Sequence, residues 1–185
     1  MTGSSEPGQS AGLACEGLVV LYVCTGNICR SAYLELRSRA LAPRVCFGSA
    51  GTAAVVGAGI APEMSDEMVG RGQGLPAFRA RQLTDGHLAA ADLVLTAAGH
   101  HRAWILERRP SDVTKVYAVG QFARSLARID PSLRGRPAVA AVSRIRLAGH
   151  PDDDVADPYG QGVAAAQACA ARLEELLAAI LPRLW

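Results

Sequence analysis

A thiol and a guanidinium near the N-terminus stand at a spacing that suits them to act together on one bound group. Cys24 follows the apolar run Leu18–Val23, and Arg30 comes six residues later, near the start of a helical pattern. A helix N-terminus beside a guanidinium lowers the pKa of a thiol and so activates it as a nucleophile. Arg also makes two-pronged contacts to an oxyanion, which Lys cannot. These residues predict attack of sulfur on a phosphate group, giving a phosphocysteine that water hydrolyses.

The loop between these two residues has the composition of an anion cradle. Its backbone N–H groups can curl into a concave ring, because Gly26 and Asn27 tolerate the left-handed dihedrals that such a ring requires. The ring opens onto a helix N-terminus, where aligned donors favour an anion. Ser31 is placed to hydrogen-bond the Cys24 thiolate and to help it leave. The competing interpretation is a buried cysteine at a strand end that merely precedes a helix-start arginine.

Apolar runs and helical patterns alternate along the chain, and they must position this loop. Strands are predicted at Leu18–Val23, Val45–Gly48, Ala91–Ala98 and Val113–Val119. Helices are predicted from about Ser31 to the stop at Pro43, near Pro62–Val69, from Gly99 to Pro110, and along an apolar stripe of Val163, Ala166, Ala170, Leu173, Leu177 and Ile180. The alternation predicts an α/β fold, a three-layer sandwich with a four-stranded parallel sheet and helices on both faces. In such sheets ligands bind beyond the carboxyl ends of the strands, where Cys24 is placed.

The segment from Gln121 to Ala148 is rich in Arg and is interrupted by Pro131 and Pro137. We expect a helix plus a loop insertion that is mostly exposed to solvent. Its arginines could attract acidic or phosphorylated partners, and a merely solvated face is the competing interpretation.

Length and composition favour one domain. The chain has 185 residues, of which 50% are hydrophobic and 19% are charged, which allows a single domain over 17–185 with a sizeable core. Residues 1–16 are rich in Gly and Ser and are predicted to be a disordered tail. A formal net charge of +2 does not mark a nucleic-acid binder. No run approaches the roughly 18 apolar residues of a membrane span, so no membrane partner is expected.

Cysteine usage indicates the compartment. Five cysteines are an odd number without regular spacing, and no export signal precedes them. We therefore expect reduced thiols in the cytoplasm. Secretion by a route without a signal peptide stays open.

Five short motifs follow one another along the chain. They are VCTGNICRS (23–31), SAGT (49–52), ARQLT (80–84), DLVLT (92–96) and DPYGQG (157–162). In residue types and order they resemble the low-molecular-weight protein tyrosine phosphatases, a family that shares its fold with the thioredoxin-coupled arsenate reductases. The resemblance covers almost the whole chain from Leu18 onward.

The resemblance implies a cysteine-dependent protein-tyrosine-phosphatase that needs no metal or other cofactor. It implies Cys24 as the nucleophile, Arg30 as the phosphate clamp and Asp157 as the general acid, which later acts as base on the hydrolytic water. The substrate-binding residues that it implies are Thr25, Gly26, Asn27, Ile28, Cys29, Ser31 and Tyr159, with Ser49 as structural support of the loop. The implied partner is a phosphorylated protein or a small aryl phosphate, and the oligomeric state stays open.

Cys29 matches the second loop cysteine of the family. This implies a reversible disulfide with Cys24 that shelters the nucleophile from over-oxidation. A packed, inert thiol is an equal alternative.

The chain also departs from the family pattern. Phe78 stands where a His commonly hydrogen-bonds the loop Asn, and Ala98 stands where an Asp is usual. Ala32 replaces the common Pro after the loop Ser, and Val55 and Val56 replace an aromatic that often walls the pocket. None of these changes removes the chemistry, but they leave phosphotyrosine, phosphoarginine and small molecules open as substrates.

Three other functions fit parts of the pattern. Arsenate reduction needs a relay through further cysteines in mid-chain, and none lies between Phe47 and Gln167. A catalytically weak phosphoprotein-binding module is compatible with the missing aromatics, although a pure binder has no need of Asp157. A zinc site is not expected, because the adjacent His100 and His101 would point about 100° apart on a helix.

Overall fold

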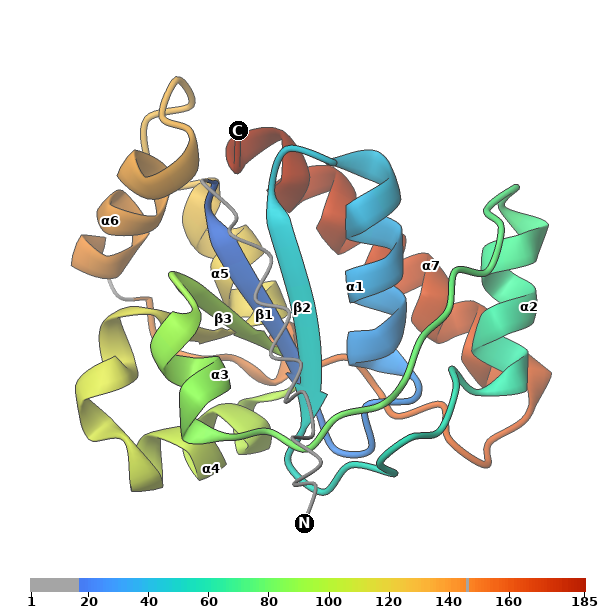
Figure 1. Cartoon of the computed structure of the whole chain (residues 1–185). Coiled ribbons are helices and arrows are strands. Elements are labelled where there is room, and N and C mark those ends of the chain that lie inside the picture. The colour runs from blue at the N-terminus through green and yellow to red at the C-terminus, as the bar shows by residue number, and fades with distance from the viewer. Residues whose placement is uncertain (1–16, 146) are drawn as a thin grey trace, which may run out of the picture.

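A four-stranded parallel sheet forms the centre of the molecule (Figure 1). The computed structural model describes residues 17–145 and 147–185. The strands are β1 (Val19–Cys24), β2 (Cys46–Gly51), β3 (Leu93–Thr96) and β4 (Val116–Ala118), in the spatial order β2-β1-β3-β4. Because all four run parallel, their carboxyl ends meet at one edge, where Cys24 lies beside Gly51 and Val23 beside Thr96.

Helices cover both faces of this sheet. They are α1 (Arg30–Leu41), α2 (Pro62–Gly70), α3 (Asp85–Ala90), α4 (Gly99–Arg108), α5 (Val119–Leu126), α6 (Gly135–Ile145) and α7 (Val163–Ile180). Three short 3₁₀ helices follow some of these elements: η1 (Pro110–Thr114), η2 (Pro151–Asp153) and η3 (Leu181–Arg183). Figure 1 shows α1 and α7 on one side of the strands and α3 and α4 on the other. The predicted three-layer α/β fold is therefore confirmed.

The alternation of side chains along β1 explains how one strand serves two cores. Val20 and Tyr22 belong to the larger core cluster, which α1, α5 and α7 complete. Leu21 and Val23 belong to the smaller cluster, which contains Leu88 of α3 and Ile105 of α4. Because successive residues of a strand point to opposite faces, a continuous apolar run is what a strand covered on both faces requires.

Several predicted boundaries differ from the structure. β2 extends to Gly51, although Val45–Gly48 was the predicted strand, because β1 pairs with it along its whole length despite its glycines. The fourth strand is only Val116–Ala118, and η1 takes up the residues before it. α3 was not predicted at all, since its six residues are too few to show a helical period. Val163 begins α7 as predicted but is exposed and lies outside the apolar stripe.

The expectation of a mostly solvated insertion after Gln121 is wrong in part. Its arginines at 124, 128, 134, 136 and 144 are exposed, as expected. However, α5 buries Phe122 and Leu126, and α6 buries Ala138 and Val142 in the larger core cluster. Pro137 does not break α6, because it lies in the first turn, where a backbone N–H has no partner within the helix to lose.

The state of the cysteines differs in part from the expectation. Cys24, Cys29 and Cys169 are free thiols, but Cys46 is disulfide-bonded, so the expectation of reduced thiols throughout is wrong for Cys46. Among the described residues, none of the helices combines the length and the apolar character needed to span a bilayer. The predicted disordered tail, residues 1–16, lies outside the described residues.

Candidate active site

The loop after β1 folds around the sulfur of Cys24. Cys24 is the last residue of β1, its side chain is buried, and its Sγ lies 3.0 Å from the Ser31 Oγ in the first turn of α1. α1 begins at Arg30 without a side-chain cap and without an acidic residue in its first turn. The positive end of the helix is therefore free to face an anion at the sulfur.

Hydrogen bonds orient the backbone of this loop. The carbonyl groups of residues 24, 25, 26 and 28 accept hydrogen bonds from the N–H groups of residues 52, 53, 55 and 61, at 2.8–3.0 Å. Within the described residues, the N–H groups of residues 26–29 donate no hydrogen bond to another protein group. Because the carbonyl groups are engaged by residues 52–61, the N–H groups of residues 26–29 are the donors that this loop can offer to an anion.

Asn27 holds the middle of the loop. It is the one described residue other than glycine with a positive φ, at 54°, which is the left-handed region that Asn tolerates. Its Nδ2 donates to the Ser31 Oγ at 2.9 Å and to the Ser49 Oγ at 2.7 Å. Its Oδ1 accepts from the backbone N–H of Arg81 at 2.8 Å. The backbone of Arg81 thus supplies a hydrogen bond to the side chain of the loop Asn.

A buried carboxylate lies behind Asn27, and sequence reasoning missed it. Ser49 donates a short hydrogen bond to Glu35, which is 2% exposed. Two exposed guanidinium groups pair with this carboxylate, Arg39 at 2.6 Å and Arg81 at 3.5 Å. A charge buried this deeply requires such partners. The available signal was a Glu between two leucines, Leu34 and Leu36, on a helix with an otherwise buried face.

Arg30 joins the loop to a segment 127 residues further along the chain. Its Nη2 lies 2.6 Å from the Asp157 Oδ2, and its Nη1 donates to the Val155 carbonyl oxygen at 3.2 Å. Its Nε is buried without a hydrogen-bond partner among the described residues. The Arg30 side chain is 4% exposed, whereas that of Asp157 is 50% exposed. The structure therefore brings together the three predicted catalytic residues, which are Cys24, Arg30 and Asp157.

Thr25 contacts a histidine that the sequence analysis considered only as a metal ligand. The Thr25 Oγ1 and the His101 Nε2 lie 2.9 Å apart. Burial, together with the neighbouring His100 and Arg30, lowers the pKa of His101 to about 3, so this ring is neutral at physiological pH. Within the described parts of the chain, no group of three or more His, Cys, Asp and Glu side chains could hold a metal ion.

Two further buried thiols lie near Cys24. Burial, followed by the charges of Cys24 and Asp157, raises the pKa of Cys29 to about 12. Burial likewise raises the pKa of Cys169, on α7, to about 12, although Arg30 opposes this shift. Both thiols are therefore protonated at neutral pH, which slows any disulfide exchange that starts from them. The redox role of Cys29 stays a prediction.

Apolar and aromatic side chains are exposed around the loop. Val55 donates its backbone N–H to the carbonyl oxygen of Gly26 at 3.0 Å, and its side chain is half exposed. Val56 and Tyr159 are 70% and 66% exposed, while Ile28 is partly buried. The backbone N–H of Tyr159 donates to the Asp157 Oδ1 at 3.3 Å, so the aromatic ring and the carboxylate belong to one turn.

The loop packs directly against Gly51, so a methyl group added at this position should distort the loop. A Cβ at Gly51 would lie 2.3 Å from the Thr25 carbonyl oxygen and 3.0 Å from the Asn27 nitrogen, so the loop would have to move. We expect Gly51→Ala to lower kcat/KM for an aryl phosphate by at least about 10-fold, because small displacements at a reacting centre are costly. Gly48→Ala is the matched control in the same strand, since its Cβ would meet nothing closer than 3.6 Å. Initial rates and thermal unfolding of both variants check this, and equal activity would contradict it.

The comparisons with known proteins agree with this geometry. Residues 19–142 match the family described as low molecular weight phosphotyrosine protein phosphatase. The chain belongs to this family. The match ends before Asp157 and Tyr159, so it does not reach the segment that pairs with Arg30.

Individual relatives support the assignment of the chain to this family. The chain is 31% identical over 123 residues to the low molecular weight protein-tyrosine-phosphatase Wzb of Salmonella typhi, covering 66% of this chain and 83% of Wzb. It is 35% identical over 103 residues to EpsP of Ralstonia solanacearum, described as a probable low molecular weight protein-tyrosine-phosphatase, covering 56% of this chain and 71% of EpsP. Among solved structures, the YwlE arginine phosphatase from Geobacillus stearothermophilus superposes with a TM-score of 0.70 at 27% identity, covering 90% of this chain and 92% of that one. The family and its members support phosphatase activity for this chain.

Proposed function

We propose that this chain hydrolyses phosphate monoesters, in the first place phosphotyrosine in proteins, through a phosphocysteine intermediate. The observation that carries the proposal is the set of free N–H groups at residues 26–29, in the loop that starts at the buried Cys24 and ends at Arg30. Such a set provides donors for the three non-bridging oxygens of a phosphate group, and Arg30 adds a charged fork.

The first chemical step transfers the phosphoryl group to sulfur. The Cys24 thiolate attacks phosphorus and forms an S–P bond while the P–O bond to the leaving group breaks. Asp157 gives its proton to the leaving oxygen, because a phenoxide or alkoxide leaves poorly without one. The backbone N–H donors are fixed before the reaction starts, so they stabilise the charge on the transferring group without reorganisation.

The second step returns the enzyme to its starting state. Asp157, now a carboxylate, takes a proton from water, and the water oxygen attacks phosphorus as the S–P bond breaks. The Ser31 hydroxyl, 3.0 Å from the sulfur, is placed to donate a hydrogen bond to the departing thiolate. Inorganic phosphate is released, and Asp157 holds the proton needed for the next turnover.

The exposed side chains around the loop, here called the rim, are compatible with more than one substrate. The exposed Val55, Val56 and Tyr159 offer apolar contacts to a flat ring held above the loop. YwlE, named an arginine phosphatase, shares the fold at 27% identity, so phosphoarginine is the second candidate. We also propose a cytoplasmic location, which suits the free thiols of Cys24, Cys29 and Cys169 but not the disulfide of Cys46, and a single domain over 17–185.

A panel of substrates tests the proposal. Initial rates are measured with phosphotyrosine, phosphoserine and phosphoarginine peptides of one sequence and with a simple aryl phosphate. We expect kcat/KM for the phosphotyrosine peptide to exceed that for the phosphoserine peptide by at least about 100-fold, because only the aromatic ring reaches the apolar rim from the depth of the loop. Val56→Asp should narrow this ratio, while Val69→Asp, an exposed valine on α2, should not. Faster turnover of the phosphoarginine peptide would replace phosphotyrosine as the substrate and keep the phosphocysteine chemistry.

A further inference from the structure

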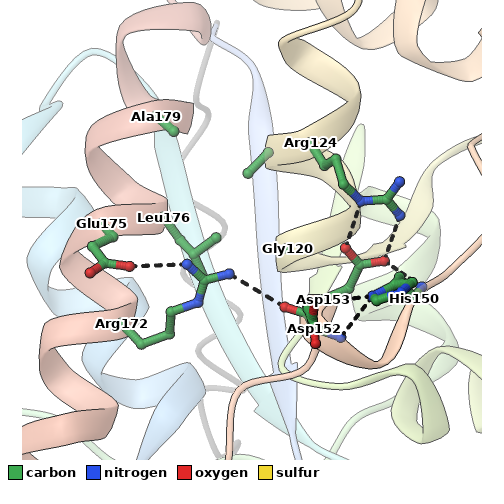
Figure 2. A pocket seen from close by; sticks show the side chains of 10 residues that line it. Gly120, Arg124, His150, Asp152, Asp153, Arg172, Glu175, Leu176 and Ala179 are labelled. Carbon is green, nitrogen blue, oxygen red and sulfur yellow. Dashed lines mark hydrogen bonds and ion pairs between the residues drawn. The ribbon is translucent and has the colours of Figure 1, made fainter.

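An ion pair outside the loop fixes the start of the segment that carries Asp157. Figure 2 shows it among the side chains that line a hollow between α5, η2 and α7. The volume of this hollow is about 450 Å³. Arg124 of α5 donates from Nε to the Asp153 Oδ1 at 3.0 Å and from Nη2 to the Oδ2 at 2.8 Å. This two-pronged geometry is the strongest form of an Arg–carboxylate contact. The same Nη2 also donates to the Ala148 carbonyl oxygen at 2.7 Å.

The backbone of Asp153 is packed as tightly as its side chain. A Cβ at Gly120 would lie 2.5 Å from the Asp153 carbonyl oxygen and 2.6 Å from its Cα, so only glycine allows α5 to approach this closely. The Asp153 side chain is 4% exposed, and its Oδ2 also accepts from the His150 backbone N–H at 2.7 Å. Burial alone would raise the pKa of Asp153, but the hydrogen bonds from Arg124 and His150 hold it below its usual value. Both the backbone and the side chain of Asp153 are thus held in place by their contacts.

The residues between Asp153 and Asp157 are also held by hydrogen bonds. The Asp154 Oδ1 accepts from the backbone N–H of Gly99, at the start of α4, at 2.7 Å. Val155 donates its N–H to the Ala97 carbonyl oxygen at 2.8 Å, and its own carbonyl oxygen accepts from Arg30. Beyond Val155, the contact that holds the Asp157 side chain to the loop is its ion pair with Arg30.

A bound phosphate group competes with Asp157 for the same guanidinium. When Arg30 turns its donors to the phosphate oxygens, its pairing with Asp157 weakens. The position of the carboxylate then depends on the backbone path from Asp153. We propose that Arg124, through Asp153, is a positioning residue that holds Asp157 in place for proton transfer while phosphate occupies the loop. This inference rests on the proposed function, in which Asp157 is the general acid.

The test compares two leaving groups. Phenyl phosphate needs a proton on its leaving oxygen, whereas 2,4-dinitrophenyl phosphate does not, and kcat/KM covers the steps up to cleavage of the P–O bond. We expect Arg124→Met to lower kcat/KM about 10-fold for phenyl phosphate and less than about 2-fold for the dinitrophenyl ester. In an Asp157→Ala background, Arg124→Met should have no further effect on phenyl phosphate, because the group that it positions is absent.

Matched variants separate positioning from stability. Arg172→Met removes another guanidinium from the same hollow (Figure 2). Among the described residues, the Arg172 guanidinium contacts the Asp152 carbonyl oxygen, at 3.4 Å, and Glu175. This substitution should leave both rates within about 2-fold of the original. If Arg124→Met does not fold, Asp153→Asn keeps the size of the buried group, removes its charge and gives the same comparison.

Two outcomes would overturn the inference. Equal losses on both esters would mean that Arg124 only stabilises the fold, and so would an additive loss in the Asp157→Ala background. If Asp157→Ala itself lost no more on phenyl phosphate than on the dinitrophenyl ester, the acid assignment would fall, and the inference with it. A leaving-group effect for Asp157→Ala without one for Arg124→Met would reject the inference alone.

Discussion

Cys24→Ser is expected to abolish turnover while leaving oxyanion binding largely intact. A serine hydroxyl at neutral pH is almost wholly protonated and is a far weaker nucleophile than a thiolate, so we expect kcat to fall by at least about 10⁴-fold. The N–H groups of residues 26–29 and Arg30 are untouched by the substitution. Initial rates with an aryl phosphate, together with calorimetric titration of vanadate or phosphate, measure the two properties separately.

Cys169→Ala is the control for this prediction. It removes a second buried thiol, on α7, that lies outside the loop. It should cost stability without a comparable loss of rate. An unchanged rate in Cys24→Ser would contradict the phosphocysteine route. Loss of rate and anion binding together would indicate a collapsed loop, and thermal unfolding of the variant would reveal it.

Asp157→Ala is expected to have the second largest effect, with a strong dependence on the leaving group. General acid catalysis typically contributes 10²–10⁴-fold, so kcat/KM for phenyl phosphate should fall within that range. The loss should shrink as the leaving group becomes more acidic, because a stable phenoxide leaves without a proton. A series of substituted aryl phosphates measures this as a steeper dependence of log kcat/KM on the pKa of the leaving phenol.

Asp157→Asn distinguishes proton transfer from the loss of a contact. The amide keeps the size of the carboxylate and can still accept a hydrogen bond from Arg30, but it has no proton to give. It should therefore resemble Asp157→Ala. If Asp157→Asn retained full rate on phenyl phosphate, Asp157 would be a partner of Arg30 and not an acid.

The local part of the site could be predicted from sequence, and its distant supports could not. The strand, the turn at Gly26 and Asn27, and the helix start at Arg30 follow one another within a dozen residues, so their pattern predicts their geometry. The contact between Arg30 and Asp157 spans 127 residues and was implied only by the resemblance to a family. His101 and Arg124 gave no local signal, because each acts through a partner that only the folded chain brings near. Glu35 gave only the local signal of a Glu between two leucines, and its contact with Ser49 also needs the folded chain.

The errors in the fold have related physical causes. β2 contains Gly48 and Gly51, which have low strand propensity, yet it pairs with β1 over six residues because tertiary context overrides propensity. The Arg-rich segment was expected to be solvated because of its many charges. Its helices nevertheless have an apolar face, on which Phe122 and Val142 are buried. Charges on one side of a helix say little about the other side.

The chain of contacts from Arg39 through Glu35, Ser49 and Asn27 to Ser31 has a consequence for how this enzyme meets its substrate. To open, the loop would have to strip a deeply buried carboxylate of its partners, and such openings are as rare as those of the surrounding core. The loop from Cys24 to Arg30 therefore has its anion-binding conformation before any ligand binds. Discrimination among ligands must come from the exposed rim, whose side chains can vary without disturbing the chemistry beneath.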